Sequence, residues 1–315
     1  MKKSCLETIH DYIDFWSTET PDNVAVNAPL RIPLVYKQLK DHVEYVAFFL
    51  NKMGIGQKNR VAIVLPNGPE MATAFISVAA YCSSAPLNQN YRAKEYQFYL
   101  TDLNAKAVIL PKDIPSPARE VAQELKIPII ELEINNNIEA GLFTLKTNRP
   151  TTSTTHEYVT EAEAEALVLH TSGTTARPKI VPLKQKNVIQ SAKNIIHTLK
   201  LTSEDRCLNI MPLFHIHGLI GALLSSITAG ASIVCTPAFD DNKFFNWIET
   251  LEPTWYTSVP TLHQAILAKA KKSSNILSGS HLRLIRSSSS PLPPQVMAEL
   301  ESLFNVPVIE SYGMT

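Results

Sequence analysis

Residues 167–181 read LVLHTSGTTARPKIV, and they run from a buried-strand pattern into a hydroxyl-rich turn. Hydroxyl groups donate hydrogen bonds, glycine lets the backbone approach a ligand closely, and lysine brings a mobile positive charge suited to phosphate oxygens. The side chains and backbone that offer these groups belong to Thr171, Ser172, Gly173, Thr174, Thr175 and Lys179. The stretch therefore predicts a phosphate-binding loop.

The spacing of this loop does not fit a P-loop. That motif has a glycine directly before its lysine and a serine or threonine directly after it. Here Pro178 precedes Lys179, and Ile180 follows it. Because short motifs also arise by chance, the alternative for a lone loop of this kind is a solvated turn rich in serine, threonine and lysine.

Four further segments occur in order along the chain. They read APLN at 85–88 followed by Tyr91 and Glu95, MPLFHIHG at 211–218, RSSSSPL at 286–292 and ESYGMT at 310–315. With these segments the chain resembles the adenylate-forming enzymes, the superfamily of acyl-CoA synthetases, luciferases and peptide-synthetase adenylation domains. The loop of that superfamily reads approximately Ser/Thr-Ser-Gly-Ser/Thr-Thr-Gly-x-Pro-Lys-Gly, and eight of its ten positions agree here. Ala176 and Ile180 stand where glycine is usual, which puts a positive φ at those two positions in doubt.

The resemblance implies a two-step reaction with ATP/AMP, Mg²⁺ and coenzyme A. A carboxylate attacks the α-phosphorus of ATP, pyrophosphate leaves, and a thiol, usually that of coenzyme A, captures the acyl-adenylate. A carboxylate is already a nucleophile at neutral pH, so the protein must mainly hold it in line and offset charge on the phosphates. The loop hydroxyls and Lys179 would hold the β- and γ-phosphates, Thr315 the α-phosphate, and Tyr312 the adenine.

The resemblance also assigns roles to the remaining candidate residues. Lys179, His215 and Thr315 are the catalytic candidates, and His215 would lie beside the acyl group. Further nucleotide contacts are expected from Ser289, Glu310, Ser311, Tyr312, Gly313 and Thr315. Thr171 is a weak candidate for the metal, because the glutamate that usually holds Mg²⁺ would follow Thr315.

Three serines give the clearest indication of the acid. Ser288, Ser289 and Ser290 replace the Gly-Ala-Ala wall of the family. Hydroxyls beside a fatty tail cost free energy, but they can hydrogen-bond a second carboxylate. Together with PLFHIHGLIGALLSS, TWYTSVPTLHQ and HLRLIRSSSS, they most closely resemble the oxalate-CoA ligase branch. We therefore expect oxalate, with two alternatives: a ligase for another acid, coumarate-like or fatty, or serines that simply form a solvated or backbone-bonded turn.

Two histidines allow a rival interpretation as zinc ligands. His215 and His217 could share a face of an extended strand, but no carboxylate or cysteine lies at helpful spacing. For His217 the other alternative is a helix-start residue hydrogen-bonded to backbone. Cys5, Cys82, Cys207 and Cys235 show no C-x-x-C spacing, which argues against a zinc site and a disulfide framework and suits a reducing compartment.

Composition points to a soluble enzyme that acts on small molecules. The chain has 315 residues, 45% apolar and 18% charged, and 29 basic residues balance 29 acidic ones, so nothing indicates a nucleic-acid partner. The N-terminus lacks a signal-peptide core, so we expect a cytoplasmic protein, with a peroxisomal location as the alternative for a full-length eukaryotic parent. Residues 213–239 carry no charge, yet their histidines, glycines and hydroxyls favour a buried helix, a turn at Gly230 and a strand at 232–235 over a membrane span.

The alternation of apolar runs with helical periodicity predicts an α/β fold of two stacked α/β/α subdomains. Strands are expected at 61–65, 107–110, 127–132, 167–170, 207–211, 232–235, 255–259, 282–286 and 306–310, and helices at 118–125 and 188–199. We assign 1–160 to the first subdomain and a threonine-rich linker, and 161–315 to the second, with the ATP-binding loop. Each motif lies at a strand end, where open α/β sheets bind ligands.

The family resemblance implies a small C-terminal lid domain that this chain lacks. We therefore expect the N-terminal AMP-binding portion of an acid-thiol ligase, nearly inactive by itself. A non-catalytic remnant that binds nucleotide is the alternative.

Overall fold

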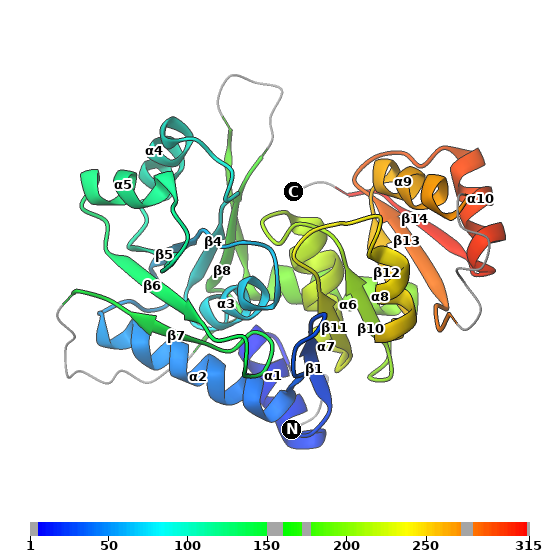
Figure 1. Cartoon of the computed structure of the whole chain (residues 1–315). Coiled ribbons are helices and arrows are strands. Elements are labelled where there is room, and N and C mark those ends of the chain that lie inside the picture. Colours follow the sequence, from blue (N-terminus) through cyan, green and yellow to red (C-terminus); the bar gives the residue numbers. More distant parts are fainter. Residues whose placement is uncertain (1–5, 150–159, 172–177, 272–279, 314–315) are drawn as a thin grey trace.

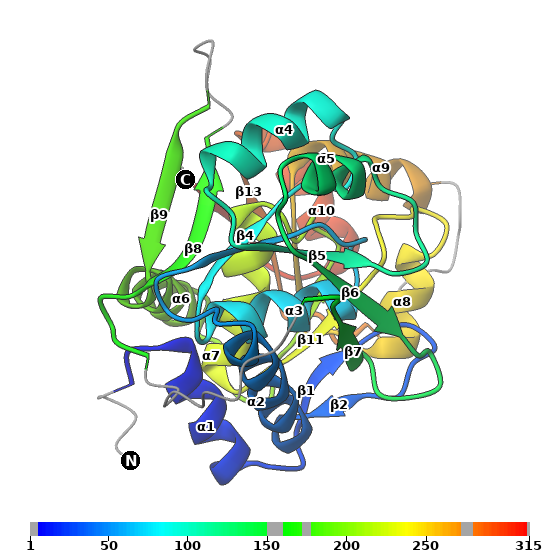
Figure 2. The same cartoon turned by 90° about the vertical axis from the view of Figure 1, so that its left-hand side faces the viewer.

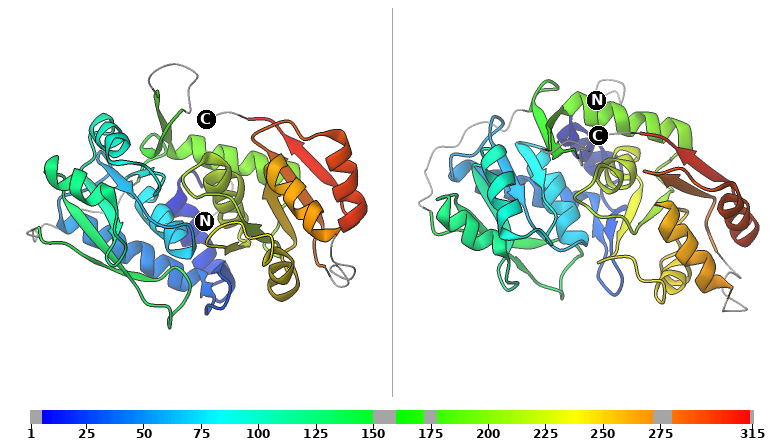
Figure 3. Two further views of the ribbon diagram at one scale, coloured as in Figure 1. Left: turned by 45° about the horizontal axis from the view of Figure 1, so that its top comes forward. Right: turned by 90° about the horizontal axis from the view of Figure 1, so that it is seen from above.

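A computed structural model describes residues 6–149, 160–171, 178–271 and 280–313 (Figure 1). Two seven-stranded sheets organise these residues. Helices cover the outer face of each sheet and also fill the space between the two sheets (Figures 2 and 3). No helix in the described ranges has both the length and the apolar character to cross a membrane.

The first sheet has the order β7-β6-β5-β3-β4-β8-β9. In chain order its strands are β3 (Arg60–Ile63), β4 (Ser83–Pro86), β5 (Ala107–Pro111), β6 (Ile129–Ile134), β7 (Phe143–Lys146), β8 (Glu165–His170) and β9 (Ile180–Lys184). The pairs β6–β7 and β8–β9 are antiparallel, and the inner pairs are parallel. Helices α4 (Ala93–Asp102) and α5 (Pro117–Glu124) cover the outer face, where Tyr96, Leu100 and Val121 pack on Val108 and Val168.

The second sheet has the order β14-β13-β12-β10-β11-β1-β2. Its strands are β1 (Val24–Asn27), β2 (Leu34–Val35), β10 (Arg206–Asn209), β11 (Ser232–Cys235), β12 (Trp255–Ser258), β13 (Leu284–Ser288) and β14 (Val308–Ser311). Only β1–β2 is antiparallel among these described pairs. The outer face carries α8 (Phe244–Leu251), α9 (Pro260–Ala270) and α10 (Pro294–Phe304).

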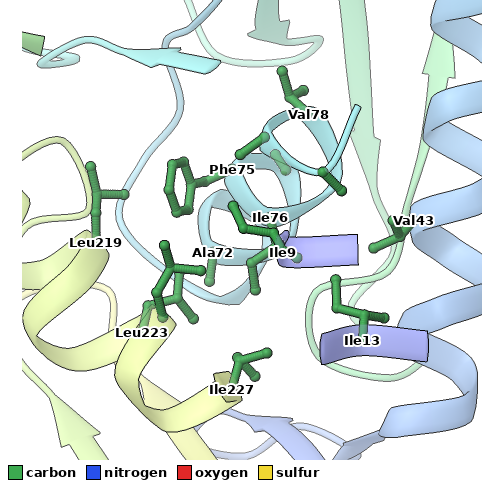
Figure 4. Packing of buried hydrophobic residues seen from close by; sticks show 14 of the residues in the cluster. Ile9, Ile13, Val43, Ala72, Phe75, Ile76, Val78, Leu219, Leu223 and Ile227 are labelled. Atoms are coloured by element: carbon green, nitrogen blue, oxygen red, sulfur yellow. The ribbon is translucent and has the colours of Figure 1, made fainter. Parts of the chain in front are cut away.

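The central core lies between the sheets. It takes buried side chains from α1 (Ile9–Glu19), α2 (Tyr36–Lys52), α3 (Pro69–Ala79), α6 (Gln185–Leu199), the π-helix η2 (His217–Leu224) and α7 (Ser225–Ala229). All eleven residues of α3 are buried, as expected for a mostly apolar helix, and its one charged side chain, Glu70, pairs with Arg31 at 3.0 Å. Figure 4 shows Phe75 and Ile76 of α3 turned toward Leu219 and Leu223 of η2.

The expected α/β class and stacked arrangement are confirmed, and the nine expected strands differ from the observed spans by a few residues. Five further strands were not expected: β1, β2, β4, β7 and β9. The expected strand at 282–286, for example, is Leu284–Ser288. The buried helix, the turn at Gly230 and the strand β11 are also as predicted. Residues 150–159 of the expected linker lie outside the described residues.

Sheet membership does not coincide with the expected division at residue 160. Strands β8 and β9 lie beyond that point and complete the first sheet, whereas β1 and β2 lie before it and complete the second. The cause is pairing: β8 lies parallel to β4, and β1 lies parallel to β11. Each sheet thus depends on strands from both halves of the chain.

Candidate active site

The described ends of the predicted phosphate loop are tied to each other. The Thr171 N–H donates to the Lys179 carbonyl oxygen at 2.9 Å, and the Lys179 N–H donates to Thr171 Oγ1 at 3.1 Å. These bonds continue the antiparallel pairing of β8 with β9, in which His170 lies opposite Ile180. The loop therefore connects strand to strand, whereas a P-loop leads from a strand into a helix. Its topology agrees with the exclusion made from spacing.

The described residues include only the two ends of the predicted loop. Ser172, Gly173, Thr174 and Thr175 lie outside the described residues, as does Ala176. Ile180 begins β9 and does not have a positive φ, so a glycine is not required there. The Lys179 side chain is exposed next to the tied ends of the loop. Its role in phosphate binding stays a prediction.

His170 holds the end of β8 against helix α4. Its Nε2 atom lies 3.1 Å from Asp102 Oδ2, and its ring meets Tyr99 edge-on with centroids 4.7 Å apart. Burial lowers the pKa of His170, although the hydrogen bond to Asp102 opposes that effect. Sequence reasoning missed this contact, because 68 residues separate the two partners and no short motif contains both.

The end of β14 presents Tyr312 to solvent. Glu310 Oε1 accepts a 2.7 Å hydrogen bond from the Leu292 N–H, and the Ser311 hydroxyl donates to the Ser287 carbonyl at 3.4 Å. These contacts join β14 to β13 and the turn that follows it. The Tyr312 side chain is 92% exposed, so its ring is free to lie against a base. Gly313 is exposed, and Thr315 lies outside the described residues.

The three serines after Arg286 do not behave alike. Ser288 is buried and donates to the Ser311 carbonyl at 3.0 Å, and exposed Ser290 donates to the Ser289 carbonyl at 2.8 Å. These two match the backbone-bonded alternative. Ser289 instead has a left-handed backbone, with φ of 75°, and its Oγ lies 3.0 Å from His217 Nδ1.

His217 begins η2 and connects three elements. It is 6% exposed, and its Nε2 atom lies 2.6 Å from Thr257 Oγ1 on β12. Both ring nitrogens therefore face side-chain hydroxyls. Of the alternative interpretation, the helix start agrees with the structure and the backbone hydrogen bond does not. Burial, followed by the positive charge of Arg286, lowers the pKa of His217 to about 3, so the ring is neutral at neutral pH. A π-helical segment of this kind often marks a functional position.

Arg286 supplies a buried positive charge at the same place. It is 8% exposed, its Nη1 atom donates to Thr257 Oγ1 at 3.1 Å, and within the described ranges it forms no ion pair. Burial lowers the pKa of Arg286 to about 10, which still leaves it protonated at neutral pH. A Cβ at Gly221 would come within 3.1 Å of the guanidinium, so glycine leaves room for it. We refer to Ser289, His217, Thr257 and Arg286 as the polar chain.

His215 lies outside the polar chain. Its side chain is exposed and its ring lies 4.5 Å from that of Phe214. The backbone turns into η2 here, with the Leu219 N–H bonded to the His215 carbonyl at 3.0 Å, so His215 and His217 do not share an extended strand. Gly218 is required in this turn, because a Cβ there would lie 2.4 Å from the Pro212 carbonyl oxygen.

The described residues do not form a metal site. They contain no group of three or more histidine, cysteine, aspartate or glutamate side chains placed to hold an ion. At the loop, Thr171 Oγ1 is a single neutral oxygen that already accepts the Lys179 N–H. Mg²⁺ prefers six oxygen ligands, several of them charged or from water. Thr171 alone therefore does not fit the ion, and its assignment as a metal ligand stays a prediction.

Comparisons with known proteins agree with this arrangement. A family model described as AMP-binding enzyme matches residues 13–315. An oxalate–CoA ligase of Arabidopsis thaliana is 36% identical, covering 98% of this chain and 61% of that protein. The oxalate–CoA ligase of Saccharomyces cerevisiae is 34% identical, with coverages of 93% and 59%. ATP-bound MatB from Rhodopseudomonas palustris has the same fold, with a TM-score of 0.81 at 22% identity over 98% of this chain and 60% of MatB. The chain thus spans about 60% of the length of these relatives.

Proposed function

We propose, since this chain belongs to the AMP-binding enzyme family, that it supplies the nucleotide- and acid-binding part of an acid-thiol ligase. In this reaction a carboxylate oxygen bonds to the α-phosphorus of ATP and the bond to pyrophosphate breaks. The thiol of coenzyme A then attacks the acyl carbon and releases AMP. The observation that carries the proposal is the loop whose described ends, Thr171 and Lys179, are tied to each other between two antiparallel strands, with the Lys179 side chain exposed.

The nucleotide would be held from two sides. The Lys179 ammonium group would offset charge on the phosphates, which is the main requirement of phosphoryl chemistry. The exposed Tyr312 ring offers a face on which adenine can stack. Strand β14 runs toward the side of the molecule where β8 ends, which supports one nucleotide reaching both residues (Figure 1).

We propose oxalate as the acid because of the polar chain. When one carboxylate of oxalate attacks ATP, the other still carries a negative charge that needs a partner. Buried Arg286 is a cation without a carboxylate partner in the described part of the chain, and Thr257 connects it to neutral His217. A fatty tail in the same place would leave these polar groups uncompensated, at a cost of about 1–3 kcal/mol for each unsatisfied group. Ser289 would hydrogen-bond the acid at the outer end of the chain.

ATP binding can be tested on this chain directly. Isothermal titration calorimetry should show that Lys179→Ala weakens ATP binding by about tenfold or more, since charge-assisted hydrogen bonds contribute roughly 1.5–3 kcal/mol. Lys184→Ala is the matched control, because Lys184 lies on β9 away from the loop and pairs with Glu163 at 2.7 Å. Equal ATP affinity in both variants and the wild type would indicate a remnant that no longer uses this loop.

The acid requires a turnover assay. Pyrophosphate exchange with ATP and Mg²⁺ should be measured on a protein extended through the downstream reading frame, with oxalate, hexanoate and coumarate compared. We expect exchange with oxalate, and its loss in Ser289→Ala but not in Ser290→Ala, whose hydroxyl bonds only to backbone. Exchange with hexanoate or coumarate at an equal rate would refute oxalate as the preferred acid, and no exchange with any acid would favour the non-catalytic remnant.

A further inference from the structure

A second ligand-sized groove lies at the opposite edge of the first sheet from the loop. Strands β5 and β6 begin at this edge, whereas β8 runs from the same edge toward Thr171. The groove measures about 630 Å³, within the usual range for small-molecule sites. Its apolar lining consists of Met53, Ile55, Leu100, Leu125, Ile127 and Pro128. We call it the basal groove.

Three cations stand around the basal groove. Lys106, Lys126 and Arg149 line it, all three are exposed, and no acidic side chain lines it with them. Within the described ranges none of the three forms an ion pair. The groove therefore combines an apolar floor with three cations that form no ion pair with any described residue.

Hydrogen bonds to neighbouring groups hold Arg149 in position. Arg149 Nη2 donates to the Lys126 carbonyl oxygen at 3.3 Å, and the Arg149 N–H donates to Thr147 Oγ1 at 3.2 Å. The Thr147 hydroxyl in turn donates to the Ile129 carbonyl at 3.2 Å, at the start of β6. The Arg149 guanidinium is thus held against the Lys126 backbone before any ligand arrives, which lowers the conformational entropy that binding must offset.

A neighbouring groove at the same edge shows why the basal groove is distinct. That groove, of about 580 Å³, shares Lys106 but also contains Glu161, Glu163 and Glu165. Two of its acidic side chains are paired: Glu165 with Arg60 of the same groove at 2.7 Å, and Glu163 with Lys184 outside the groove lining. Unlike the basal groove, this neighbouring groove therefore has acidic side chains beside its cations.

We propose that the basal groove binds a free phosphate monoester with an apolar chain, such as an alkyl phosphate. The chain would lie on the apolar floor and the phosphate would face Lys126, Arg149 and Lys106. A phosphate monoester carries close to two negative charges near neutral pH and three acceptor oxygens, so it matches three cations better than a carboxylate does. A free molecule fits better than a bilayer, because proteins dock on membranes through projecting apolar side chains, whereas these apolar groups line a hollow.

The test uses dodecyl phosphate below its micelle-forming concentration, measured by isothermal titration calorimetry on this chain. We expect saturable binding that Lys126→Gln combined with Arg149→Gln weakens by about a hundredfold, since each lost charged contact accounts for about tenfold in affinity. Lys58→Gln is the matched control: it removes a charge at the same edge, but from the groove that contains the glutamates. Binding that survives the double substitution would overturn the proposal.

Further arms separate the remaining explanations. Inorganic phosphate binding as tightly as dodecyl phosphate would show that the apolar floor is not used, and dodecyltrimethylammonium binding as tightly would show that charge is not selected. Capture by vesicles containing phosphatidic acid without binding of free dodecyl phosphate would indicate a membrane surface instead. Lys179→Ala should leave dodecyl phosphate binding unchanged, so this proposal and the proposed ATP site fail independently.

Discussion

Removing the Thr257 hydroxyl should destabilise the protein strongly although the side chain keeps its shape. Thr257→Val replaces an oxygen by a methyl group of similar size, so packing is nearly preserved. The hydroxyl is the shared partner of His217 Nε2 at 2.6 Å and Arg286 Nη1 at 3.1 Å, and Thr257 is completely buried. The substitution therefore isolates the polar contacts from the cavity term.

The expected cost follows from what is left behind. A buried polar atom without a partner costs about 1–3 kcal/mol, and more when it is charged. Thr257→Val leaves two such atoms, of which one belongs to a buried guanidinium, so we expect a loss of about 3–5 kcal/mol. Thr257→Ser keeps the hydroxyl and loses one methyl group, which costs about 1 kcal/mol in a packed core. The loss expected for Thr257→Val is a large part of a typical protein stability of about 5–15 kcal/mol.

Urea unfolding followed by both tryptophan fluorescence and circular dichroism measures this difference. Coincident curves are needed, because a chain with two sheets can unfold in more than one step. At pH 7 we expect the free energy of unfolding of Thr257→Val to be clearly lower than that of Thr257→Ser. Equal stability of Thr257→Val and Thr257→Ser would refute the reasoning, since it would mean that His217 and Arg286 find other partners.

Three further substitutions test other features. Gly218→Ala should destabilise the protein by about 2 kcal/mol or more, because its Cβ would clash with a backbone carbonyl. Gly56→Ala is the control, because open space surrounds Gly56. Similar shifts of the melting temperature in both variants would contradict this prediction. Burial disfavours the Asp205 carboxylate, but hydrogen bonds led by Arg283 outweigh it and lower its pKa, so Asp205→Asn should cost about 2–3 kcal/mol at pH 7. That stability is present above the unfolded pKa and is lost as pH falls through the lower folded pKa. The difference in urea-unfolding free energy between the wild type and Asp205→Asn should therefore become smaller below about pH 3.8. Burial lowers the pKa of His42 to about 4. The free energy of unfolding of the wild type should therefore fall as pH falls from 6.5 to 4, by at most about 3 kcal/mol from this group. If the wild type loses no more free energy of unfolding than His42→Phe over this range, the prediction is contradicted.

The strands and the family could be predicted because both depend on local sequence. Short apolar runs such as 167–169 form buried strands, and the runs at 107–110 and 232–235 correspond to β5 and β11. Motif order identified the AMP-binding family, which the family match over residues 13–315 shows. The tie between Thr171 and Lys179 was not predicted, because no strand was expected at 180–184, where β9 pairs with β8.

Which strands belong to which sheet, and which residues form the polar chain, could not be predicted from local sequence. The pairing of β8 with β4 is set by a parallel register far apart in sequence, which no local period encodes. His217, Thr257 and Arg286 come from three elements separated by 40 and 29 residues, so no spacing rule connects them. The hydroxyl pattern at 288–290 was visible, but not the backbone bonds that occupy two of those hydroxyls.

The polar chain places stability and the proposed function in opposition. Burying a guanidinium without a carboxylate costs free energy, and the lowered pKa of Arg286 reflects that cost. Neutral His217 cannot offset the charge, and Thr257 supplies only a dipole. An apolar side chain at 286 would pack in the same place without that penalty, so folding alone does not explain an arginine there. An anionic acid would relieve the penalty only while it is bound, and the resulting gain in free energy would favour dianionic acids over fatty ones.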